Sequence, residues 1–386
     1  MMEMRDTRFQ KLTSMMQLYE LDAIIASTIE NNLYLGNFVN VGQKIYRDSQ
    51  AFTIVLPSSK VPYYILPAAE LPATIEAGVA PEQIHTFGSF LFDYEERNAL
   101  ADAVRDARNR TLPTAIDIFH TLFTTELSAC KRVGVETANI TANDMKLLAS
   151  AMPNIEIIPV DNLLMDMRVI KDDEEIANLA LASEKAETAL FKVLHLLQPG
   201  MTEYDAYQIY QKTIIELNAD PTFAYFTFNR RTAYVDTFSS SSNKLQEGDL
   251  IRCDVGCSVN GYHSDMARTA VLGIPSDTIK STYEAVLQGL LTGIDAMRPG
   301  VPVRDIFNLC VSETRKNGLP QYQRHHCGHA IGLRPNESPL INASTEAVLQ
   351  KNMVFSVETP FYRVGWGGLM VEDTLVITDS GVRMLT

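Results

Sequence analysis

The first part of the chain alternates between helical and strand patterns. Residues 7–19 carry their large apolar side chains on one face of a predicted helix, and residues 22–27 form a short apolar run typical of a buried strand. The same criteria predict strands at 51–56, 63–66 and 155–160 and helices at 94–108 and 141–152. The alternation predicts an α/β domain over residues 1–160.

A different pattern begins near residue 161. An amphipathic stretch leads into a long predicted helix that ends at Pro199-Gly200, and Thr202 with Asp205 forms a capping-box-like pair that opens the next helix. Further on, the pattern predicts a strand at 222–228 and helices at 280–297 and 303–317. Residues 161–386 are therefore predicted to form an α+β domain in which two helix pairs pack on a sheet.

Two carboxylates lie on a predicted hairpin within residues 250–273, LIRCDVGCSVNGYHSDMARTAVLG. Apolar and polar residues alternate on both sides of the Asn-Gly pair at 260–261, which is a strong signal for a tight hairpin turn. With that turn, position 256 faces position 265, so Asp254 and Asp265 become diagonal neighbours on one face, roughly 7 Å apart. Two acids this close raise each other's pKa unless a cation lies between them.

Three more potential ligands follow downstream. His329 lies in RHHCGHAIGL, and Glu358 and Glu372 lie on apolar runs separated by the glycine-rich residues 363–368, which suit a second hairpin. On that pairing the two glutamates lie opposite one another. A carboxylate in the middle of an apolar strand must be paired or liganded, because burial of an isolated charge is prohibitive.

Two Asp, two Glu and one His make a hard, oxygen-rich donor set. Such a set suffices for two divalent ions, and Mn²⁺, Co²⁺, Fe²⁺ or Zn²⁺ would suit it better than a thiolate-seeking metal. The five cysteines do not compete for this role: they are an odd, scattered set expected to stay reduced. Cys253 and Cys257 share a strand face opposite to Asp254, which favours core packing for both.

Length and charge narrow the class of protein. A chain of 386 residues suggests two domains, and the net charge of −14 argues against nucleic acid or an anionic membrane as a partner. No apolar run reaches the roughly 18 residues of a membrane span, and the first ten residues carry acids where a signal peptide needs a basic and then an apolar segment. We therefore expect a cytoplasmic protein.

The order and context of the five ligands resemble the pita-bread metallopeptidases, and in particular their creatinase, prolidase and aminopeptidase P branch. The chain follows the pattern of that branch in order: two Asp separated by ten residues, His in His-x-x-Gly-His, Glu after Met-Val-Phe, and Glu-Asp before an apolar strand. Residues 31–36, NNLYLG, and 167–176, MRVIKDDEEI, are similar to its N-terminal domain and its domain junction. The resemblance covers nearly the whole chain.

The resemblance implies a fold, an assembly and a set of roles. It implies a two-domain homodimer in which two metal ions are bound by Asp254, Asp265, His329, Glu358 and Glu372, with Asp265 and Glu372 bridging the ions. Glu358 would also be the general base, His325 matches the first His of the His-x-x-Gly-His motif, and Tyr362 matches a tyrosine beside the substrate pocket.

Three positions depart from the family around the substrate. The peptidases have a histidine seventeen residues before the first ligand, where this chain has Thr237, and another seven residues after the metal histidine, where it has Asn336. They commonly have arginine two residues before the last ligand, where this chain has Met370. The ligand set is complete, whereas the substrate shell is altered.

Other side chains are weaker candidates for substrate contacts. Asp236 is a candidate acid or base in place of the absent imidazole, and we interpret His326 as structural. Four residues are candidates for binding an anionic substrate, although ordinary solvated charges are the more common fate of such side chains: Asn229, Arg230, Arg231 and Arg334.

Three hypotheses about function remain from the sequence. The first is a metal-dependent hydrolase that cleaves a C–N bond, peptide or amide, in a small molecule or a short peptide and is related to Xaa-Pro dipeptidase and aminopeptidase. In it the ions would activate water and Glu358 would accept its proton. The second is a hydrolase of non-peptide amidines or guanidines, as in creatinase and ectoine hydrolase. The third is a non-catalytic pita-bread protein that binds partners, which we rank last because such members lose ligands and this chain keeps all five.

Overall fold

The computed structural model describes residues 4–46 and 49–386. The chain forms two compact units, Met1–Met167 and Arg168–Thr386, which are considered separately below. The sequence pattern places the domain boundary a few residues earlier, between residues 160 and 161.

The first unit is built on a six-stranded mixed sheet with strand order β4-β3-β2-β1-β5-β6. Strand β1 pairs in parallel with β5 and antiparallel with β2. The strands are β1 (Ala23–Ala26), β2 (Phe52–Leu56), β3 (Ser59–Pro67), β4 (Ile84–Phe87), β5 (Arg132–Val135) and β6 (Glu156–Pro159). The α-helices are α1 (Asp6–Leu18), α2 (Ile29–Gly36), α3 (Val41–Ile45), α4 (Leu71–Glu76), α5 (Ala99–Arg108), α6 (Ala115–Thr124) and α7 (Ala142–Ala151).

The predicted elements of this unit are present, and others were missed. Helix α5 starts later than the pattern suggested, because the side chain of Asn98 caps the amide of Ala101. The pattern did not reveal α6 or the shorter elements α2, α3, α4, β4 and β5, which are too short for a clear period. One apolar core joins α6 and α7 to the sheet, and a second lies under α4 and α5.

The second unit surrounds a nine-stranded sheet whose main path runs β12-β11-β13-β16-β10-β8-β7. Its longer strands are β7 (Asp220–Phe228), β8 (Leu250–Val259), β10 (Met266–Val271), β13 (Val354–Glu358) and β16 (Glu372–Ile377). The shorter ones are β9 (Tyr262–His263), β11 (Gly328–Ala330), β12 (Glu337–Leu340) and β17 (Val382–Met384). A separate two-stranded sheet pairs β14 (Phe361–Arg363) with β15 (Gly367–Leu369). The α-helices are α8 (Asp161–Val169), which crosses from the first unit, α9 (Asp173–Leu196), α10 (Glu203–Glu216), α11 (Asp277–Ala296) and α12 (Val303–Lys316).

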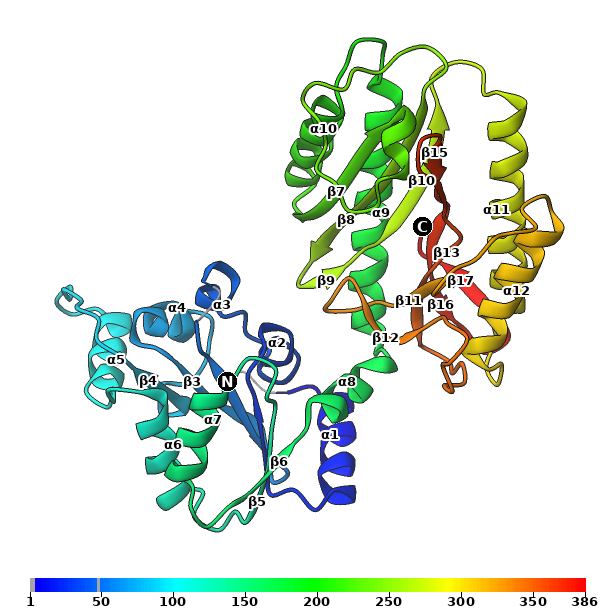
Figure 1. The fold of residues 1–386 in the computed structure, drawn as a ribbon. Coiled ribbons are helices and arrows are strands. Elements are labelled where there is room, and N and C mark those ends of the chain that lie inside the picture. Colours follow the sequence, from blue (N-terminus) through cyan, green and yellow to red (C-terminus); the bar gives the residue numbers. More distant parts are fainter. Residues whose placement is uncertain (1–3, 47–48) are drawn as a thin grey trace. The chain divides into compact units, whose positions relative to one another are not determined.

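Two helix pairs cover this sheet, as the sequence predicted. Helices α9 and α10 pack on the half with β7 and β8, whereas α11 and α12 pack on the half with β13 and β16 (Figure 1). The predicted capping box at Thr202 is present and opens α10. Cys253 and Cys257 lie in the first of these cores and are fully buried, which confirms their predicted packing role.

The predicted turn at Asn260 and Gly261 is also present. Both residues have positive φ, 51° and 83°, as a tight two-residue hairpin turn requires. Ser258 pairs with His263 close to the turn, and Asp254 pairs with Ala267 farther from it in the same register. This register keeps position 256 opposite position 265, as predicted.

Gly256 is expected to be essential for that register. A Cβ there would lie 2.4 Å from the backbone oxygen of Ser264, which cannot move without opening the hairpin. We expect Gly256→Ala to lower the free energy of unfolding by about 1–3 kcal/mol in a urea titration. The matched control is Gly381→Ala, where an added Cβ meets no atom within 4 Å and stability should change by less than about 0.5 kcal/mol. Equal effects of the two substitutions would contradict this account.

Candidate metal centre

Five neighbouring strands each present one of the predicted metal ligands. In the strand order β11, β13, β16, β10 and β8, the residues are His329, Glu358, Glu372, Asp265 just before β10, and Asp254. Glu358 pairs directly with Glu372, and Ala267 pairs with both Glu372 and Asp254. Since alternate residues of a strand share a face, this register places all five on the same side of the sheet.

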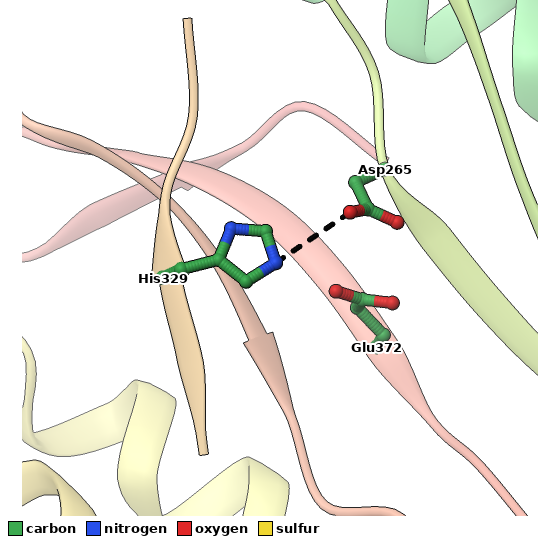
Figure 2. A group of neighbouring side chains, drawn as sticks. All are labelled: Asp265, His329 and Glu372. Carbon is green, nitrogen blue, oxygen red and sulfur yellow. Dashed lines mark ion pairs between the residues drawn. The ribbon is translucent and has the colours of Figure 1, made fainter. Parts of the chain in front are cut away.

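Three of these side chains converge closely. Asp265, His329 and Glu372 each offer a ligand atom, and these atoms lie within 4.8 Å of one another. Figure 2 shows them pointing toward a common point from three separate strands, with His329 Nε2 at 3.5 Å from Asp265 Oδ2. All three are buried. The distances suit a shared divalent cation after small side-chain adjustments.

Glu358 is held from the other side by two basic residues. Arg324 Nη2 lies 3.4 Å from Glu358 Oε1, and His326 Nδ1 lies 3.0 Å from the same oxygen. The backbone amide of Gly328 also lies 3.2 Å from His326 Nδ1. One ring nitrogen cannot both donate and accept a proton, and the shorter, charge-assisted contact with the carboxylate favours Nδ1 as a donor.

Burial and mutual repulsion control the charges of the acids. Burial raises the pKa of Asp254 to about 6, although Arg252 opposes the shift. Burial, with the charges of Asp254 and Glu358, raises the pKa of Asp265 well above its ordinary value, and burial with the charge of Asp265 does the same for Glu372. Burial also opposes ionisation of Glu358, but the hydrogen bond from His326 and the charge of Arg324 outweigh it and lower the pKa of Glu358.

The donor set fits a divalent cation. Glu372 is 1% exposed, and its Oε2 has no hydrogen-bond partner among the described residues. A buried carboxylate oxygen without a donor is costly, and a cation would satisfy it. Carboxylates and one imidazole are donors that Mn²⁺, Co²⁺, Fe²⁺ and Zn²⁺ accept, whereas the described thiols are buried in apolar cores.

Tyr362 and Arg252 lie beside the acids. Arg252 Nη1 donates to the hydroxyl of Tyr362 at 3.3 Å and lies 3.7 Å from Asp254 Oδ2. The guanidinium groups of Arg252 and Arg324 both lie over the ring of Tyr362, at 5.4 and 5.7 Å from its centroid. Burial raises the pKa of the Tyr362 phenol, so this hydroxyl keeps its proton at neutral pH.

The other predicted site residues lie farther out. His325 is exposed, and its ring contacts that of His326 at a centroid distance of 4.3 Å. Asp236 is exposed, yet its charge contributes to the raised pKa of Asp254. Asn336 is exposed just before β12, and the backbone amide of Arg334 donates to Glu337.

The altered positions have structural partners here. Thr237 accepts a hydrogen bond from Arg231 Nη2 at 3.4 Å, and Arg231 is committed to the buried Glu203. Met370 is buried and contacts the Tyr362 hydroxyl through its sulfur at 3.4 Å. Of the basic residues suggested for anion binding, Arg231 therefore has a structural partner, and Arg230 is exposed.

Sequence reasoning missed three residues of the site. His326, interpreted as structural, contacts Glu358, and neither Arg252 nor Arg324 was singled out. Arg252 could have been found: it lies two residues before Asp254 on the same face of an apolar strand, and a buried cation needs a partner as much as a buried acid does. Nothing in the local pattern distinguishes His326 from His325.

Fold and donor set together define a metal-dependent hydrolase of the pita-bread class. Residues 177–379 match the model of metallopeptidase family M24, and residues 8–170 match that of the creatinase/prolidase N-terminal domain. The chain belongs to metallopeptidase family M24, and this membership supports metal-dependent peptide hydrolysis. The resemblance to the creatinase and prolidase branch is thus confirmed, as are the α/β and α+β fold classes.

Relatives at moderate identity include named dipeptidases. The Xaa-Pro dipeptidase of Pyrococcus furiosus is 29% identical over 233 residues, which cover 60% of this chain and 67% of that protein. The uncharacterized peptidase YqhT of Bacillus subtilis is 29% identical over 264 residues, which cover 68% of this chain and 75% of the relative.

Solved structures share the fold. The dipeptidase from Pyrococcus horikoshii OT3 matches with a TM-score of 0.80 at 22% identity, covering 98% of this chain and 97% of that one. The X-Pro aminopeptidase from Thermotoga maritima matches with a TM-score of 0.78 at 21% identity, with the same coverage. Within the described part of this chain, no helix has both the length and the apolar character needed to cross a membrane.

The repulsion among the acids leads to a stability prediction. Asp265→Asn removes one ionisable group and keeps the shape of the side chain. At pH 7 without metal, the free energy of unfolding of the variant should therefore be about 1–3 kcal/mol higher than that of the unaltered chain. Because the pKa of Asp265 is raised in the folded state, its penalty is present at neutral pH and disappears as the pH falls toward the unfolded value near 4. Added Mn²⁺ should reverse the order of stability.

Thermal and urea unfolding at pH 4.5 and 7, with chelator or with Mn²⁺, would measure this reversal. The exposed Asp295 provides the matched control, since Asp295→Asn should behave like the unaltered chain in all four conditions. A metal-free Asp265→Asn variant that is less stable at pH 7 would contradict the electrostatic account.

Proposed function

We propose that this chain is a two-metal peptidase that hydrolyses the amide bond of short Xaa-Pro peptides. The observation that carries the proposal is the convergence of Asp265, His329 and Glu372, with Asp254 and Glu358 on the neighbouring strands. The relationship to Xaa-Pro dipeptidases adds support. The five side chains would supply enough donors to hold two divalent ions, and Asp265 and Glu372 lie at the two central strands of the group.

The bound ions would lower the pKa of water and polarise the scissile carbonyl. The chain itself contributes a base and hydrogen-bonding groups. Glu358, whose lowered pKa keeps it ionised at neutral pH, would accept the proton of the attacking water and pass it to the leaving nitrogen. Hydrogen bonding from His326 fixes the carboxylate of Glu358 for this transfer.

We infer that Mn²⁺ is a suitable ion, because the donors are mainly carboxylate oxygens. Within this proposal Tyr362 lies against the substrate, and His325, Asp236, Asn336 and Arg334 lie at the periphery of its site. A homodimer and a cytoplasmic location stay predictions of the sequence.

The altered positions keep a second substrate class open. Thr237 and Asn336 cannot supply the imidazole protons expected around a tetrahedral intermediate, and Thr237 is bonded to Arg231. Cyclic amidines and guanidino acids, which lack a prolyl leaving group, therefore stay in the test as the second substrate class. A non-catalytic role is disfavoured because no predicted ligand is missing.

A substrate panel with a metal requirement tests the proposal. Xaa-Pro dipeptides, Xaa-Ala dipeptides, cyclic amidines and guanidino acids are incubated with protein loaded with Mn²⁺, and release of product is followed. We expect hydrolysis of the Xaa-Pro peptides, loss of activity with chelator, and a drop of at least about 10³-fold for Asp265→Ala. Metal analysis should give close to two ions per chain.

Each alternative outcome has a defined meaning. Turnover of amidines without turnover of Xaa-Pro peptides would replace the proposed substrate class and keep the metal chemistry. Full activity in chelator, or one ion per chain in the active protein, would overturn the two-metal mechanism. Asp295→Asn again serves as the control, with activity equal to that of the unaltered chain.

A further inference from the structure

Arg252 occupies an unusual place for a cation. It lies within β8, two residues before Asp254, and its side chain is 0% exposed. The neighbouring residues Ile251 and Cys253 belong to the apolar core, whereas Arg252 shares the face of the acids. A fully buried guanidinium is costly unless its contacts are specific, so its partners indicate its role.

The two ends of the guanidinium bind different parts of the site. Nη2 donates to the backbone oxygens of Tyr234 and Val235, at 2.7 and 3.0 Å. These carbonyls lie directly before Asp236 and Thr237, the segment that borders the acids. Nη1 donates to the Tyr362 hydroxyl at 3.3 Å and lies 3.7 Å from Asp254 Oδ2. Arg252 thus joins three separate segments of chain.

The bond from Arg252 determines the direction of the Tyr362 proton. Because the phenol oxygen accepts from Nη1, its own proton points elsewhere, and here it points to the sulfur of Met370 at 3.4 Å. A thioether is a weak acceptor, so a substrate oxygen could readily replace it. The buried phenol keeps its proton, and Tyr362 is therefore oriented as a hydrogen-bond donor.

We propose that Arg252 is a positioning residue that holds the Tyr362 hydroxyl as a donor toward the substrate and tethers residues 234–237 beside Asp254. The expected effect on kcat rests on the proposed hydrolase function. The hydrogen bonds that tether residues 234–237 to Arg252 do not depend on activity. Lysine is a poor substitute, because one ammonium cannot reach the two carbonyls and the hydroxyl in the fixed geometry of a guanidinium.

A double-mutant cycle tests the link to Tyr362. The variants are Arg252→Met, Tyr362→Phe and both together, loaded with Mn²⁺ and assayed on the best Xaa-Pro dipeptide. We expect each single variant to lower kcat by about 10–100-fold with a smaller change in KM. The double variant should be no more than about threefold below the worse single variant, because Arg252 acts through the hydroxyl. Independent, multiplying losses would overturn the proposal.

A second arm tests whether the guanidinium itself is required. Met370 contacts the same hydroxyl from the opposite side, so Arg252→Met combined with Met370→Arg can present a new guanidinium to Tyr362. We expect this pair to recover at least about tenfold in kcat over Arg252→Met alone. Arg252→Lys should stay low, and a fully active lysine variant would show that charge alone suffices and would overturn the positioning role.

Hydrogen exchange of the metal-free protein provides a readout without catalysis. The amide of Tyr234 donates to the backbone oxygen of Arg231 at 2.9 Å and exchanges when this segment opens. We expect exchange in residues 229–238 to be about tenfold faster in Arg252→Met and Arg252→Lys and unchanged in Tyr362→Phe. Unchanged exchange in all three would overturn the tether, whereas absent Xaa-Pro turnover in the unaltered chain would refute only the proposed function.

Discussion

Mutual repulsion of buried carboxylates on one sheet face is the constraint on which the second unit depends. Asp254, Asp265, Glu358 and Glu372 lie on adjoining strands, and burial raises the pKa of three of them while Glu358 stays ionised. A sheet can hold such a group only if its strands are fixed elsewhere. The two helix pairs and their apolar cores supply that stability from the opposite side.

The arrangement of basic residues follows from the same constraint. Arg324 and His326 contact Glu358, while Arg252 contacts Asp254, so the basic side chains lie beside the outer acids of the group. The central acids Asp265 and Glu372 have no arginine or lysine within salt-bridge distance among the described residues, and burial lowers the pKa of His329, which lies beside Asp265. A metal ion would therefore stabilise the two central acids most, whereas basic side chains of the protein already stabilise the two outer acids.

The altered substrate shell includes residues that contact the basic side chains around the acids. The sulfur of Met370 is a weak acceptor for the Tyr362 hydroxyl, and Arg252 on β8 donates to the same hydroxyl. Thr237 closely follows Tyr234 and Val235, whose backbone oxygens accept hydrogen bonds from Arg252. Two of the three departures from related peptidases, Thr237 and Met370, are thus linked through the contacts of Arg252, whereas Asn336 is exposed just before β12.

The sequence by itself determined the two hairpins that carry the acids and their register. The Asn-Gly turn sets the pairing of β8 with β10, and the glycine-rich segment between β13 and β16 sets Glu358 opposite Glu372, since the two-residue period of a strand leaves no freedom once a turn is placed. Only the tertiary structure decided which basic residues meet those acids. Arg324 and His326 reach Glu358 from a loop far away in the sequence, and short-range patterns carry no information about such contacts. Arg252 is the exception, because it lies two residues before Asp254 on the same strand. The same reason explains why His326 rather than His325 contacts Glu358: the path of a loop is fixed by the packing around it and not by its own residues.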